Sequence, residues 1–160
     1  QVVRRLLKKR RSGINVSASV KDKSCSVFVE HNKGPLPPGF EADHQFAQLH
    51  KDDIFLSLSD RDSCIAVKGV GPMLVRNILR LNGEIFLVCE AFRHERDLYS
   101  TPLPSSGVGI VLELKLCGKF SVLPATDGFL KCVRFPMPDD SMRFAIIPLI
   151  HSHALPIQNV

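Results

Sequence analysis

The chain has 160 residues, 44% of them hydrophobic, which suits one folded domain with a core of its own. No apolar run approaches the roughly 18 residues that span a bilayer. No run of about 7–15 apolar residues follows the basic start, which argues against a signal peptide. The net charge of +5 is concentrated at one end: six of the 21 basic residues lie in the first eleven positions, and the other 15 nearly balance the 16 acidic ones. Because the chain starts at Gln1, we expect it to be part of a longer protein.

Residues 1–13 are predicted to form a short basic helix. Apolar residues recur at i, i+4 spacing between Val2 and Leu7, and Ser12-Gly13 is a suitable helix end. A dense block of cations favours DNA, RNA or another polyanion as a partner, and a solvated helix end or linker is the alternative. The residues predicted to contact nucleic acid are Arg4, Arg5, Lys8, Lys9, Arg10 and Arg11.

Residues 14–40 are predicted as an N-terminal hairpin followed by a loop. Residues 14–20 alternate apolar and polar side chains, as a half-buried strand does, and residues 25–29 would be the returning strand. Residues 31–40 hold three prolines and two glycines, which exclude a helix or a central strand. Residues 41–160 would then be the main body, beginning with one helical turn or an irregular lead-in at 41–50.

The strongest local signal is a hairpin in the middle of the chain. Two apolar, β-rich runs, 72–81 and 84–92, are joined by Asn82-Gly83. Both central residues of a type I′ turn need φ > 0, which Asn and Gly tolerate. This sequence therefore predicts an antiparallel pair with a two-residue turn.

Short strand-like runs follow one another on both sides of this hairpin, with no helical pattern between them. Strands this short and this evenly spaced predict an all-β fold, a small closed or nearly closed antiparallel barrel over residues 41–160. A polar loop is predicted at 93–106. The other predicted strands are 54–58, 64–67, 108–115, 120–123, 130–135 and 142–150.

The five cysteines predict reduced thiols and no cofactor. An odd number without a secretory signal is typical of the cytosol or nucleus, and the lack of a Cys-x-x-Cys pair argues against structural zinc. Because Cys25, Cys64, Cys89 and Cys132 lie in or beside strand-like runs, they are interpreted as small core side chains.

Motifs for catalysis are weak. The acid pairs Asp52-Asp53 and Asp139-Asp140 fit solvated turns, and His151 and His153 lack a third metal ligand in the sequence. Ser105-Ser106-Gly107 does not match the Gly-x-Ser-x-Gly nucleophile turn. The sequence therefore predicts a protein that is not an enzyme, and a small thiol- or serine-dependent hydrolase is the alternative.

One ligand site is predicted in the polar loop. Phe92 and Tyr99 bracket a charged stretch that includes Glu95 and Asp97. Aromatic rings beside acids can bind a cation such as methylated lysine. The alternative is that Phe92 packs inward and Tyr99 only anchors the loop.

Three short motifs between Asp53 and Phe135 resemble the bromo-adjacent homology (BAH) family. They are Asp53-Ile-Phe-Leu56, Phe92-Arg93 and Lys131-Cys-Val133. The resemblance implies a BAH-like barrel in a chromatin-associated protein. The family's Trp-Phe-Tyr run is reduced here to Glu90-Ala91-Phe92, which puts an aromatic cage in doubt.

A second set of strings covers more of the chain. These strings are Ser63-Cys-Ile-Ala-Val67, Asn82-Gly-Glu-Ile-Phe-Leu87, Tyr99-Ser-Thr-Pro102, Ser105-Ser-Gly-Val-Gly-Ile110 and Lys131-Cys-Val133. They resemble the C-terminal region of animal transposon-derived proteins of the CACTA-transposase type. The resemblance implies a non-catalytic β-module that follows a nuclease core. We therefore expect an intracellular, nuclear interaction module that binds protein partners or other domains of its own chain, and DNA or RNA through its basic N-terminus.

Overall fold

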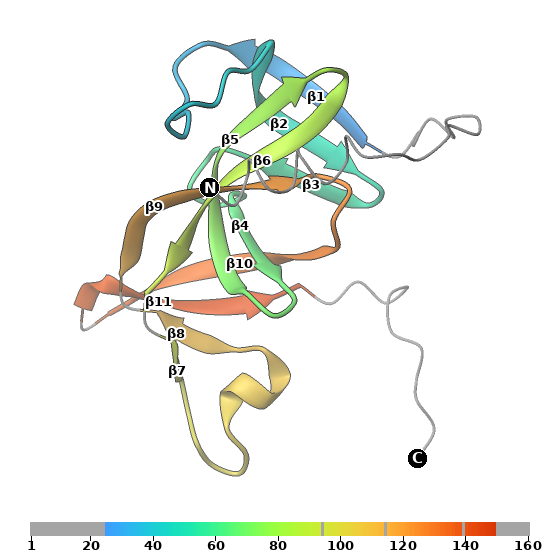
Figure 1. The fold of residues 1–160 in the computed structure, drawn as a ribbon. Helices are drawn as coiled ribbons and strands as arrows, with labels where there is room; N and C mark the ends of the chain where they lie inside the picture. Colours follow the sequence, from blue (N-terminus) through green and yellow to red (C-terminus); the bar gives the residue numbers. More distant parts are fainter. Residues whose placement is uncertain (1–24, 94, 114, 139, 150–160) are drawn as a thin grey trace.

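The computed structural model describes residues 25–93, 95–113, 115–138 and 140–149 (Figure 1). These residues form strands and one 3₁₀ turn, η1 (Ser105–Val108), and every strand pairing is antiparallel, so the all-β prediction is confirmed. The basic helix predicted at 1–13 and the strand predicted at 14–20 lie outside the described residues. The strands are β1 (Cys25–His31), β2 (His44–Lys51), β3 (Ile54–Ser57), β4 (Cys64–Val67), β5 (Gly71–Leu81), β6 (Glu84–Phe92), β7 (Glu95–Asp97), β8 (Val111–Glu113), β9 (Leu116–Pro124), β10 (Phe129–Met137) and β11 (Asp140–Pro148).

The predicted central hairpin is confirmed as β5 and β6. Asn82 and Gly83 have φ values of 52° and 79°, and Leu81 pairs directly with Glu84 across the turn. β5 also pairs with β4 and β2 along its other edge, and β6 pairs with β9. The hairpin therefore forms the centre of the sheet.

β2 corrects the helical turn or irregular lead-in expected at 41–50. The strand pairs with β1 along one edge and with β3 and β5 along the other. Phe46 and Leu49 are both buried, and their spacing of three is equally compatible with a helical turn. Strand pairing on both edges decides the conformation because tertiary contacts outweigh local preference. β1 and β2 therefore belong to one sheet, although they lie on opposite sides of residue 40, the predicted boundary between the N-terminal section and the main body.

A buried amide fixes the Pro/Gly-rich loop that follows β1. Asn77, fully buried in β5, donates from Nδ2 to the carbonyl oxygen of Pro35 (3.1 Å) and to Oε1 of Gln45 (2.8 Å). Gln45 also accepts a bond from the N–H of Gly34 (3.1 Å). A Cβ on Gly34 would overlap the Asn77 side chain, so the close approach of loop and strand requires glycine at this position.

The buried apolar side chains lie on both faces of the β5–β6 hairpin, because successive residues of a strand point to opposite sides. Val75 and Cys89 pair across the hairpin in one cluster, and Leu74 belongs to a second cluster with Cys64 and Cys132. Cys64, Cys89 and Cys132 are all buried, as the sequence predicts. The cluster around Val75 contains Phe46, Leu49, Leu56, Ile65, Met73, Val75, Ile78, Leu87, Cys89 and Ala125.

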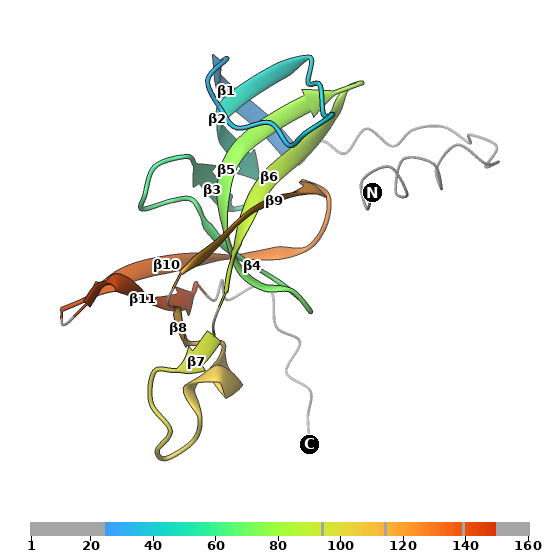
Figure 2. The same ribbon diagram turned by 60° about the vertical axis from the view of Figure 1, so that its left-hand side comes forward.

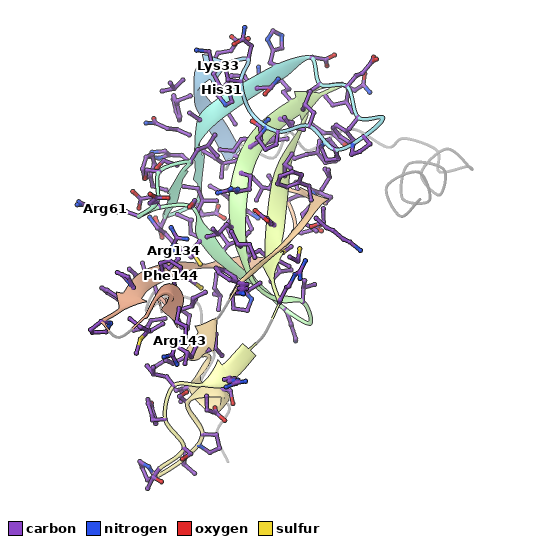
Figure 3. The ribbon with its side chains drawn as sticks, turned by 90° about the vertical axis from the view of Figure 1, so that its left-hand side faces the viewer. His31, Lys33, Arg61, Arg134, Arg143 and Phe144 are labelled. Atoms are coloured by element: carbon purple, nitrogen blue, oxygen red, sulfur yellow. The ribbon has the colours of Figure 1, made fainter. Side chains whose placement is uncertain are left out.

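β10 joins two groups of strands. Residues 129–131 pair with β4, and residues 132–137 pair with β11, which leads through β8 to β7. The guanidinium of Arg134 lies 4.5 Å from the ring centre of Phe144 and 3.3 Å from Asp60, so the turn between β3 and β4 is held against β10 and β11 (Figure 3). Within the described residues, β1, β7 and β9 each have a single neighbouring strand. The sheet is therefore open, which corrects the prediction of a closed or nearly closed barrel.

Candidate functional site

The predicted ligand loop belongs to a projecting lobe, residues 95–113, formed by β7, η1 and β8 (Figure 2). Ser105 links its two halves. The Ser105 hydroxyl, fully buried, accepts from the N–H of Leu98 (2.7 Å), and its backbone N–H donates to the carbonyl oxygen of Tyr99 (2.9 Å). The carbonyl oxygen of Ser105 accepts from the N–H of Ile110 (3.0 Å). Hydrogen bonds therefore fix the conformation of the lobe.

Asp97 closes the base of the same lobe. Its Oδ1 accepts from the backbone N–H of Ser106 (2.8 Å). The backbone bond from Ser106, followed by side-chain bonds from Ser106 and Ser105, lowers the pKa of the Asp97 carboxyl. Asp97 therefore carries its negative charge at neutral pH while it holds η1 in place.

The segment of the lobe between β7 and β8 exposes apolar side chains. Tyr99 is 44% exposed, Leu103 70% and Val108 57%. We call these three residues the apolar tip. Exposed apolar groups on one ordered projection are typical of a surface that contacts another molecule.

The family model of a domain of unknown function, DUF8592, matches residues 30–149. The chain belongs to this family. The match extends from the end of β1 through β11, so it includes the whole lobe. No curated protein and no solved structure matches the chain.

The DUF8592 domain places the four predicted ligand residues in different surroundings. Phe92 packs against the cluster that contains Leu74, so its ring belongs to the core, as the alternative interpretation states. Tyr99 is at the surface, and Asp97 is bonded to η1. The backbone of Glu95 pairs with β8, and its side chain lies outside the described part. The structure thus brings Asp97 and Tyr99 into one lobe and puts the ring of Phe92 elsewhere. The six predicted nucleic-acid contacts, 4–11, lie outside the described residues.

The serine and cysteine side chains that a hydrolase could use as nucleophiles take part in the packing and hydrogen bonding of the fold. The Ser105 hydroxyl is buried and holds the lobe. Burial raises the pKa of the Cys89 thiol to about 12, which keeps it protonated. A hydrogen bond from Cys64 lowers the pKa of Cys132, and burial opposes this shift. Within β9, the Cys117 thiol is hydrogen-bonded to the backbone of Lys119.

Within the described ranges, His, Cys, Asp and Glu side chains do not gather in threes as a metal site would require. A helix long and apolar enough to cross a membrane is also not found in the described part of the chain.

The sequence reasoning missed one charged pair in the centre of the sheet. Arg76 of β5 lies with Nε 3.2 Å from Oε2 of Glu90 on β6. The Glu90 side chain is only 8% exposed, whereas that of Arg76 is 43% exposed. The only signal in the sequence was a cation and an acid, Arg76 and Glu90, in the interior of two facing apolar runs that also hold Arg80 and Glu84 near the turn.

Proposed function

We propose that this DUF8592 domain is a non-catalytic interaction module whose lobe binds a protein partner. The observation that supports this proposal is the apolar tip on an ordered projection. A loop that is already ordered loses little conformational entropy on binding, and its apolar side chains gain by leaving water.

The chemistry of the lobe favours a cationic peptide. The exposed ring of Tyr99 offers a π face, and Asp97 supplies a charge two residues away in sequence. A methylated lysine would suit this combination with a single ring, because the ring of Phe92 packs in the core. The resemblance to BAH domains and to transposon-derived proteins supports a nuclear, chromatin-associated role, with the basic N-terminal block as a contact for DNA or RNA.

The test is chemical-shift mapping of the full chain with a panel of modified histone peptides. We expect shifts in residues 95–113 and a loss of affinity of about tenfold on Tyr99→Ala, because a desolvated cation–π contact contributes up to about 2 kcal/mol. Phe28→Ala is the matched control, since Phe28 is 47% exposed on β1, outside the lobe. If no peptide shifts the lobe at millimolar concentration, or if both variants bind equally, the proposal is wrong.

A further inference from the structure

Two irregularities in the sheet meet at Glu90. A bulge in β5 between Val75 and Asn77 turns Arg76 toward this carboxylate. A second irregularity, in the pairing of β6 with β9, brings the N–H of Gly118 to Oε1 of Glu90 (3.0 Å). Bulges often redirect a side chain beside a functional site.

The two oxygens of the buried carboxylate therefore have different partners. Oε2 faces Arg76 and Oε1 accepts from Gly118. A buried ion pair contributes little net stability compared with apolar packing. Its clear effect here is geometric: Glu90 holds Arg76 through Nε, and the outer nitrogens of the half-exposed guanidinium can still donate.

Further cations surround the same segment of β9. Arg93 donates from Nη2 to the carbonyl oxygen of Cys117 (2.9 Å), one residue before Gly118. Lys115, whose carbonyl oxygen accepts from the N–H of Arg93, and Lys119 are exposed beside it. Arg76 therefore contacts the carboxylate itself, and Arg93, Lys115 and Lys119 belong to the chain segments next to Gly118, which also contacts it.

An aromatic ring completes the surface. Phe120 of β9 pairs directly with Glu90, so its side chain leaves the sheet on the same face, and it is 40% exposed. In the described part of the sheet, β9 has β6 as its single neighbour, which leaves this edge open. A basic groove with an accessible ring is the combination that binds single-stranded nucleic acid, through phosphates and stacked bases.

We propose that Arg76, Arg93, Lys115, Lys119 and Phe120 form a binding surface for single-stranded nucleic acid. Arg76, oriented by Glu90, contacts a phosphate with its outer nitrogens, because the planar guanidinium matches phosphate geometry. Phe120 stacks with a base. This surface includes no residue of the basic N-terminal block or of the apolar tip.

The test measures binding of a fluorescein-labelled oligothymidylate of roughly 20 nucleotides, longer than one such groove occupies. The protein is the full chain in which the six basic residues between positions 4 and 11 are replaced by Gln, so that the described surface is measured alone. We expect Phe120→Ala to weaken binding at least about fivefold. Lys119→Gln should lower the salt dependence by about 0.7 in the log–log slope, the contribution of one phosphate on a single strand.

Both substitutions leave the ion pair intact, so the variants should fold, which circular dichroism checks. Phe135→Ala and Lys68→Gln are the matched controls, because Phe135 is exposed on β10 and Lys68 is exposed in the turn between β4 and β5, and they should bind as the parent does. The double change Arg76→Gln with Glu90→Gln removes the ion pair without leaving a buried charge, and it should also weaken binding. Tyr99→Ala should have no effect, which separates this surface from the lobe.

Three results would overturn the proposal. The first is no measurable binding of the oligonucleotide at low salt. The second is an equal loss of affinity in the surface variants and the controls. The third is tighter binding of a poly-glutamate peptide than of the oligonucleotide, which would assign the surface to an acidic protein.

Discussion

The buried thiol of Cys89 makes the stability of the fold depend on pH. It lies fully buried on β6 between β5 and β9, and burial raises its pKa from the ordinary 9.0 to about 12. Between these values the unfolded chain releases the proton while the folded chain keeps it. The stabilising effect is therefore complete below about pH 9 and falls as the pH rises toward 12, by about 1.4 kcal/mol per pH unit.

Urea denaturation at several pH values between 7 and 11 checks this prediction. Other groups titrate in the same range, so the comparison is with Cys89→Ala. That variant should be less stable at pH 7 because of the cavity, and its stability should fall less steeply above pH 9. Parallel curves for the two proteins would contradict the effect of Cys89.

The Arg76–Glu90 pair shows why sequence alone could not find the candidate surface on β9. If regular pairing continued from the Asn82-Gly83 turn, Arg76 would lie opposite Cys89. The Arg76 side chain would then point to the face of the sheet away from Glu90. The bulge between Val75 and Asn77 shifts the pairing by one residue and brings the charges to one side. Neither the bulge nor its position follows from the alternation of apolar residues, because alternation assumes regular pairing.

At the scale of the element, the central hairpin gives a direct test of its turn. A Cβ at Gly83 would meet nothing within 4 Å, so a substitution there changes only the backbone preference at φ 79°. We expect Gly83→Val to lower the free energy of unfolding by about 1–3 kcal/mol, because a β-branched residue resists positive φ.

Gly83→Asn is the matched control, since Asn tolerates this region and should lose much less stability. Chemical denaturation of the three proteins gives the comparison. If the Val and Asn variants unfold at the same midpoint as the parent, backbone strain at the turn is not important.

The elements differ in how well their sequences predict them. The hairpin was predictable because Asn82-Gly83 and two β-rich runs indicate the same structure. β2 was not, because its strand conformation depends on pairing with β1 and β5, which are distant in the chain, as well as with β3. The lobe was predicted as a loop at 93–106 and a strand at 108–115, but the role of Ser105 within it depends on contacts with Leu98 and Ile110 that a motif search does not test.

At the scale of the whole molecule, β10 should make the two groups of strands unfold together. It pairs with β4 at one end and with β11 at the other. Cys89 belongs to one buried cluster, and Cys132 belongs to another. We expect the two thiols to become accessible in the same global opening, so their protection free energies should agree within about 0.5 kcal/mol.

Thiol-labelling rates measured in variants that keep only Cys89 or only Cys132 check this prediction. Each protection free energy is compared with the free energy of unfolding of the same variant. Earlier labelling of Cys132, well below that value, would mean that the β10–β11 group opens separately.

The open architecture was the least predictable property at this scale. Short, evenly spaced strands are compatible with a barrel, and the all-β class followed from them. Closure depends on whether the last strands pair with the first, and here β11 pairs with β10 and β8, and β8 pairs with β7, so the sheet ends in the lobe. No local pattern reports that path, because it is set by which edges remain available after the central hairpin has paired.

The hydrogen bonds that stabilise the lobe leave its exposed positions free to vary, both in evolution and in engineering. The hydrogen bonds described for it use backbone atoms and the side chains of Ser105 and Asp97, not the side chains of the apolar tip. Positions 99, 103 and 108 can therefore diverge among descendants of one ancestral domain while the frame stays the same. A combinatorial library at these three positions would turn the lobe into a small scaffold from which binders for new targets could be selected.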